Sequence, residues 1–236
     1  MPRLSKHGAG FFNRPLAAAL SLATVLAGTP AIAHLPAIRG KLVELVQRSD
    51  LIVIGSADRV IPVGTSLVDT TVTIAEVLAG TADEKHLTFR GPTRFAPGER
   101  YVFFLHRTPD GFAAQQDSGT VFPCTAADDA IYRSTVQALS HALQSDVAAR
   151  PDAIRAALLP ALTAMSDPLR YSAALELVSL AQSGHPPTLA ERARIEQLLH
   201  DKATDPALQP LLNALLRFAA PAAVATPAAP NRLDSQ

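Results

Sequence analysis

Hydrophobic residues recur at two different intervals along the chain, and the interval changes near Thr125. Between Leu51 and Phe122 they form short runs or alternate with polar residues, a pattern typical of β-strands. From Thr125 onward they recur at every third or fourth position, as in amphipathic helices. The pattern predicts an α+β protein in which a small, closed β-barrel is followed by an all-α helical lobe.

The strands expected in the front half are short and separated by turn residues. Residues 68–77 alternate, which predicts a buried face carrying Val68, Thr70 and Val72 and a wet face opposite. The pair at 97–98, Pro-Gly, suits the centre of a type II turn. The expected strands are 51–54, 68–77, 87–90 and 101–105, with a return of the chain from Phe112 after a tight turn at 109–111.

Helices are expected on both sides of this barrel. Residues 38–49 carry an apolar stripe that predicts a helix packed across the barrel. Asp167 and Asp205 are each followed by proline, which suits a helix start, and Thr188 begins a capping box with Glu191. A further apolar stripe predicts a helix after the barrel that contains Ile131, Thr135, Leu139 and Leu143.

The order of these segments resembles a known family. A helix followed by segments 49–55, 72–80 and 95–105 is similar to the OB barrel of netrin modules and tissue inhibitors of metalloproteinases, over about residues 42–122. In those inhibitors an N-terminal cysteine reaches the zinc of the protease. The only cysteine here is Cys124, so the resemblance implies the fold without that inhibitory activity. Segment 158–177 resembles one HEAT repeat unit, which implies a HEAT-like lobe too short to form a free solenoid.

The first 33 residues have the order of a cleavable export signal. Three basic residues precede an apolar run, Leu16–Leu26, which is too short to span a bilayer, and Ala31 and Ala33 fit a signal peptidase. A buried N-terminal helix of the fold is the alternative interpretation. Cleavage after Ala33 predicts a periplasmic or secreted protein of a Gram-negative bacterium, with no stable membrane anchor after cleavage.

Charge and cysteine content narrow the classes of function. Three of the 21 Lys and Arg residues lie in the leader and none of the 21 Asp and Glu, so the remaining chain has 18 basic residues against 21 acidic ones. This balance argues against a nucleic-acid partner, which needs clustered basic side chains. A single cysteine permits no disulfide within the monomer, and the sequence indicates no cofactor and no phosphate-binding loop.

The histidines suggest one hypothesis of a metal site, a site for copper. Cleavage after Ala33 would make His34 the N-terminal residue, whose amine and ring can hold a copper ion, with His86 or His106 as a further ligand. An accident of the cleavage site is the simpler interpretation, because nothing in the sequence brings these three residues together. The sequence therefore assigns no metal ligand.

No catalytic group stands out either. Cys124 has no dependable histidine partner and is interpreted as a small buried residue. Glu76, Glu99, Asp128 and Asp129 could pair across a cleft, but Glu99 suits a turn and the two aspartates suit a helix N-terminus. The sequence assigns no catalytic residue. The aromatic residues that suit core packing better than a stacking platform are Phe89, Phe95, Tyr101, Phe103 and Phe104.

The organisation expected from these observations has four parts. They are a signal peptide (1–33), an OB-like barrel (34–124), a HEAT-like lobe (125–220) and a disordered tail rich in proline and alanine (221–236). The expected role is that of an exported, non-enzymatic module that binds another envelope protein or a small ligand. Two alternatives stay open: a metal-binding protein or enzyme that uses His34, and an inhibitor of an envelope hydrolase.

Overall fold

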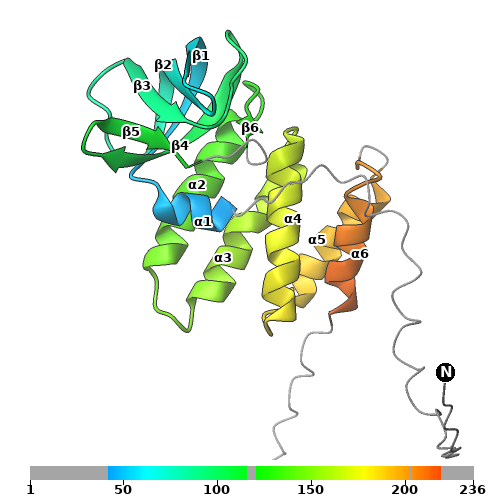
Figure 1. Cartoon of the computed structure of the whole chain (residues 1–236). Coiled ribbons are helices and arrows are strands. Elements are labelled where there is room, and N and C mark those ends of the chain that lie inside the picture. Colours follow the sequence, from blue (N-terminus) through cyan, green and yellow to red (C-terminus); the bar gives the residue numbers. More distant parts are fainter. Residues whose placement is uncertain (1–41, 116–120, 202–203, 219–236) are drawn as a thin grey trace, which may run out of the picture. The chain divides into compact units, whose positions relative to one another are not determined.

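The computed structural model describes residues 42–115, 121–201 and 204–218. The leader, His34 and the segment 221–236 lie outside these ranges, so what the sequence predicts for them stays a prediction. Within the described ranges, no helix combines the length and the apolar character needed to cross a membrane. The order of elements confirms the α+β class, with a helix, then a barrel, then further helices (Figure 1).

In the part of the chain that the structure describes, six strands follow helix α1 (Leu42–Arg48). They are β1 Leu51–Val63, β2 Leu67–Ala79, β3 His86–Gly91, β4 Arg100–Thr108, β5 Gly111–Ala114 and β6 Phe122–Pro123. Five of them close into a barrel in the order β1-β2-β3-β5-β4, because β4 pairs back onto β1. Neighbours in this ring are antiparallel except β3 and β5, which run parallel, and β6 adds to β4. The arrangement is that of an OB-like barrel, as the sequence predicted.

Strand β1 is longer than the segment 51–54 that the apolar run predicted. Its first residues pair with both β2 and β4, whereas the residues beyond Ser56 pair only with β2 and are largely solvent-exposed. Backbone hydrogen bonds to β2 hold this second half as a strand, in which Ala57 is buried in the barrel core and Val60 packs against that core. The strand was predicted to end early because Gly55 follows the apolar run 51–54 directly.

The paired parts of β1 and β4 are buried on both faces. Every residue in 51–54 and in 101–105 is less than a tenth exposed. Alternate residues belong to the core of the barrel, and the residues between them point outward, toward helices that contact the barrel. Burial on both sides explains why these strands appear in the sequence as unbroken apolar runs.

Aromatic rings fill the barrel interior, as predicted. The ring centroid of Phe103 lies 4.9 Å from that of Phe95, 5.4 Å from that of Phe89 and 5.9 Å from that of Tyr101. Most of these contacts are edge-on or tilted, the arrangements that aromatic pairs prefer. Phe104, on the outward face of β4, is also buried and packs on Phe122.

Two glycines are required by the backbone. Gly98 has a φ of 84°, and the amide of Glu99 donates to the carbonyl of Ala96 at 3.2 Å, which confirms the turn predicted at 97–98. Gly80, which follows β2, has a φ of 82°, and a Cβ there would lie 2.2 Å from the carbonyl oxygen of Asp50. Only glycine fits that position without moving the backbone.

The helices enclose a second core. They are α1 Leu42–Arg48, α2 Asp129–Gln144, α3 Arg150–Leu158, α4 Asp167–Gln182, α5 Leu189–His200 and α6 Gln209–Arg217, with a short 3₁₀ helix at Leu159–Thr163. Helix α1 was predicted to pack across the barrel. It contacts β4, but most of its contacts are with α2 and α4, so it lies between the barrel and the lobe (Figure 1).

The helix starts were predicted with mixed success. The capping box is confirmed, because Thr188 Oγ1 accepts from the amide of Glu191 at 3.3 Å and Glu191 Oε2 accepts from the amide of Thr188 at 2.7 Å. At α4 the N-cap position is Ser166 rather than Asp167. Helix α6 begins at Gln209, because the carboxylate of Asp205 binds the amide of Ala207 and forms a separate turn first.

The buried face of α2 is rotated from the predicted stripe. Only two of the four predicted residues are buried, since a spacing of four drifts around a helix of 3.6 residues per turn. The buried residues of α2 are Tyr132, Thr135, Val136, Leu139 and Ala142.

Candidate functional site

A groove of about 670 Å³ lies on the barrel between strands β2 and β3 and the β4–β5 hairpin. Leu67 and Phe112 give it apolar surface, and Thr88 and Thr108 add hydroxyl groups. The volume and the mixed lining are those of a site for a small molecule or for a few residues of a peptide. OB barrels bind their ligands with the face of strands β2 and β3 and the loops beside it, which is where this groove lies.

An ion pair forms one wall of the groove. Arg90 on β3 donates two hydrogen bonds to the carboxylate of Asp69 on β2, at 2.7 and 3.0 Å. The pairing lowers the pKa of Asp69 and raises the pKa of Arg90, mainly through these hydrogen bonds. Both side chains therefore stay charged at neutral pH.

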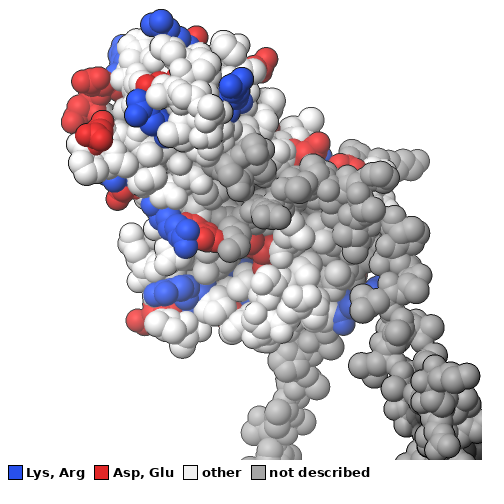
Figure 2. Space-filling model, in the orientation of Figure 1, with Lys and Arg blue, Asp and Glu red and all other residues white. Residues whose placement is uncertain are grey.

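A second arginine contacts the groove residue Phe112. The guanidinium of Arg107 lies over the ring of Phe112, 5.0 Å from its centroid, in a cation–π contact. Figure 2 shows basic and acidic side chains interspersed over this view of the molecule, with no broad field of one sign.

A hydrogen-bonded row continues from this wall across the outer face of the barrel. The hydroxyl groups of Thr71 and Thr88 are 3.0 Å apart. Thr73 Oγ1 donates to Asp58 Oδ2 at 2.5 Å and lies 3.1 Å from His86 Nδ1. Because the single hydroxyl proton of Thr73 is donated to Asp58, Thr73 Oγ1 accepts a hydrogen bond from His86 Nδ1. The row is exposed and orders the side chains of three neighbouring strands.

The structure places two of the three histidines considered for copper, and the third, His34, lies outside the described residues. His86 is an exposed residue of β3, and His106 is a half-buried residue of β4 whose Nδ1 has no hydrogen-bond partner. In the part of the chain that the structure describes, no three His, Cys, Asp or Glu side chains gather in a way that could hold a metal ion.

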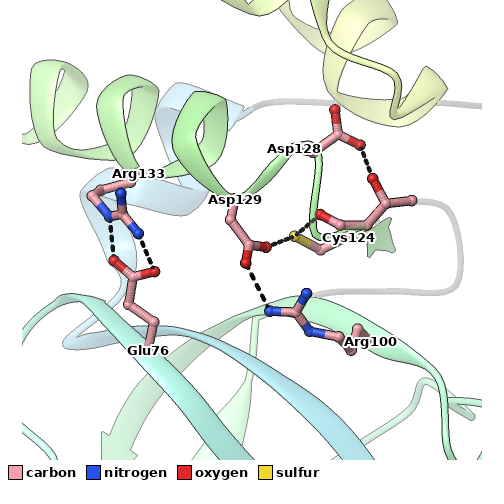
Figure 3. Close-up of polar contacts among 7 residues, drawn as sticks. Glu76, Arg100, Cys124, Asp128, Asp129 and Arg133 are labelled. Carbon is pink, nitrogen blue, oxygen red and sulfur yellow. Dashed lines mark hydrogen bonds and ion pairs between the residues drawn. The ribbon is translucent and has the colours of Figure 1, made fainter.

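Cys124 lies where the barrel meets the helices and is buried, as predicted (Figure 3). Its thiol donates a hydrogen bond to Asp129 Oδ1 at 3.2 Å. Burial, followed by the neighbouring Asp129, raises the pKa of the thiol to about 12. A nucleophilic cysteine needs the opposite shift, so this side chain is a structural hydrogen-bond donor.

Two ion pairs join the barrel to α2. Arg133 on α2 binds the carboxylate of Glu76 on β2, with one of its two contacts at 2.7 Å, and Arg100 on β4 binds Asp129 at 3.0 Å (Figure 3). The pairing with Arg133 lowers the pKa of Glu76. Of the four acids considered as a cleft, Glu76 and Asp129 thus serve the contact between barrel and helices, and Glu99 lies in a turn as predicted.

Asp128 differs from its neighbour Asp129. It occupies the N-cap position of α2, but its side chain makes no capping bond, contrary to the role predicted for it. Its carboxylate is fully buried and accepts from the amide of Met165 at 2.7 Å and from Thr125 Oγ1 at 3.0 Å. Nearby, the hydroxyl of Tyr132 donates to the carbonyl of Pro123 at 3.1 Å and lies 2.8 Å from Ser166 Oγ. These bonds tie the end of the barrel to the segment before α4.

Another acidic side chain, that of Glu176, holds α1 against α4. Glu176 of α4 accepts the backbone amide of Val43 with both oxygens, at 3.1 and 3.3 Å, beside a pocket of about 570 Å³. Burial raises the pKa of Glu176 to about 8, against the lowering effect of these backbone amides. The group therefore retains its proton in the folded state at pH values where the unfolded chain has released it.

Stability is expected to depend on pH through Glu176. The contribution of a group with a raised pKa is complete below about pH 4.5 and is lost as the pH rises through about 8. Because Glu176 is only half-buried, we expect a loss of about 1–2 kcal/mol across this range, relative to Glu176→Gln. Urea unfolding of both proteins at several pH values measures it, and parallel stability curves would contradict the assignment.

The fold and the groove together define an α+β protein with an OB-like barrel, a helical lobe and a candidate binding surface on the barrel. Neither models of known protein families nor curated proteins match this chain. The groove was not predicted from the sequence, because it is built from residues near positions 67, 90 and 112 that only the strand order brings together.

Proposed function

We propose that this chain is an exported binding protein that receives a peptide segment in the groove between strands β2 and β3 and the β4–β5 hairpin. The single observation that carries the proposal is the groove itself: about 670 Å³, with apolar surface from Leu67 and Phe112 beside the ion pair of Arg90 and Asp69. Apolar surface with a few fixed polar groups is the usual composition of a binding site.

A peptide suits this groove better than a nucleic-acid strand. The arginines at the groove are accompanied by acidic residues, Asp69 and Asp110, that would repel a chain of phosphates. The rings of Phe89 and Phe103 are buried in the core and are not available to stack on bases. Peptides offer both the apolar side chains and the hydrogen-bonding groups that the walls can satisfy.

The leader, Met1–Ala33, supports export, and the proposed setting is the periplasm or the outside of a Gram-negative cell. In this proposal the barrel is related to the netrin and metalloproteinase-inhibitor type, and the helical lobe to HEAT units. Mass spectrometry of the exported protein tests the first point directly, with His34 expected as its first residue.

A peptide-library selection tests binding at the groove. Random twelve-residue peptides displayed on phage are selected in parallel on the wild-type protein, on Leu67→Glu and on Phe112→Arg. Arg59→Ala, which changes an exposed residue of β1 that does not line the groove, is the matched control. The wild type and the control are expected to enrich one consensus that both groove variants lose.

The two groove variants separate a loss of peptide binding from a loss of folding. Leu67 is 40% exposed, so its replacement leaves the barrel core intact even if Phe112→Arg disturbs folding, which circular dichroism reports. Enrichment of the same consensus on all four proteins, or of none on the wild type, overturns the proposal.

A further inference from the structure

A smaller pocket of about 400 Å³ adjoins the groove and shares Pro92 with it. Thr65 and Ser66, in the turn between β1 and β2, and Arg94, which follows β3, contribute to its lining. The pocket therefore offers two exposed hydroxyl groups and one guanidinium at one end of the larger groove. A ligand that fills the groove beside Phe112 can extend past Pro92 into it.

Unlike Arg90, Arg100 and Arg133, Arg94 has no acidic partner among the described residues. Arg90, Arg100 and Arg133 each bind a carboxylate of the protein. In the described part of the chain, the exposed Arg94 forms neither an ion pair nor a hydrogen bond through its side chain. Its planar guanidinium is free to bind an oxyanion through two parallel hydrogen bonds.

The local charge balance selects a singly charged anion. Among the residues that the structure describes, the charged side chains that line the two pockets are Arg90, Arg94, Asp69 and Asp110, and Arg107 contacts the groove through Phe112. Three positive charges against two negative ones leave an excess of one, which a carboxylate neutralises. A phosphate dianion would exceed it and would be repelled by the two aspartates.

We infer that the pocket at Arg94 binds a carboxylate group of a peptide whose neighbouring side chains occupy the groove beside Phe112. This inference rests on the proposed function and adds the chemical class of the ligand. The carboxylate belongs either to the C-terminus of the peptide or to an Asp or Glu side chain. Both sources offer Arg94 the same planar pair of oxygens.

The test uses three small probes and the whole ¹⁵N-labelled chain. The probes are N-acetyl-leucyl-alanine, its C-terminal amide, and the amide of N-acetyl-leucyl-glutamate, each titrated while backbone NMR shifts are followed. Shifts at Gly91 and Ala113 report binding in the groove, and shifts at Ser66 and Arg94 report binding in the smaller pocket. Inorganic phosphate at the same ionic strength is the fourth titrant.

A carboxylate is expected to tighten binding about tenfold over the neutral amide, with shifts at Ser66 and Arg94. Whichever of the two carboxylate probes gains this factor identifies the source. Arg94→Gln is expected to remove the gain, whereas Arg59→Gln, at another exposed arginine, keeps it.

The outcomes separate the inference from the proposed function. If the neutral amide shifts Gly91 and Ala113 but no carboxylate adds affinity, the inference is wrong and groove binding stands. If none of the leucine probes shifts the groove, groove binding itself fails, and the inference fails with it. Phosphate binding at Arg94 that equals or exceeds carboxylate binding overturns the assignment of a carboxylate.

Discussion

Phe103→Ala is expected to lower the free energy of unfolding by about 3–5 kcal/mol. The Phe103 side chain is fully buried, and its ring contacts three other aromatic rings in the barrel core. Alanine would remove both the free energy gained by burying the ring and its packing contacts. The closed barrel would keep the neighbouring side chains from filling the cavity. The loss is a large fraction of the free energy of unfolding of a typical domain, about 5–15 kcal/mol.

Urea unfolding followed by circular dichroism measures this effect. Phe103→Leu is the matched variant, and a smaller loss is expected because it retains most of the apolar volume. A loss below about 1 kcal/mol for Phe103→Ala would mean that the aromatic cluster does not hold the barrel together.

Asp128→Ala is expected to cost about 2–3 kcal/mol, because it removes a fully buried acceptor of two hydrogen bonds. The change removes the acceptor for the amide of Met165 and for the hydroxyl of Thr125. It also releases the contact between the start of α2 and the segment before α4.

The neighbouring residue provides the control for this prediction. Asp129 is partly exposed and pairs with Arg100 at 3.0 Å, so Asp129→Ala is expected to cost about 1 kcal/mol or less. Both variants are compared by urea unfolding at pH 7. Equal losses for the two aspartates would contradict the distinction between them.

For Asp128 and Asp129, the sequence predicted their position at a helix start but not their separate roles. Their position before an apolar stripe correctly placed the start of α2, because acidic residues favour a helix N-terminus. Which of them is buried depends on Met165, which lies 37 residues further along the chain. A local pattern contains no information about such a contact, so the different roles of Asp128 and Asp129 could not be predicted.

The barrel could be predicted because its signals are local. Unbroken apolar runs marked the parts of β1 and β4 that are buried on both faces, and alternation marked β2. The groove could not be predicted, because Leu67, Arg90 and Phe112 become neighbours only through the pairing of β2 with β3 and of β3 with β5. The sequence also could not show that Arg94 lacks an acidic partner among the described residues, since the pattern around a charged loop residue does not depend on whether it forms an ion pair.

The outward-facing apolar residues of β1 and β4 limit how this protein can be divided. A fragment ending at Cys124 would retain a closed barrel with Ile52, Ile54 and Phe104 on an uncovered flank. Such a flank invites self-association. We therefore expect that the barrel cannot be moved into another protein without the helices that cover this flank.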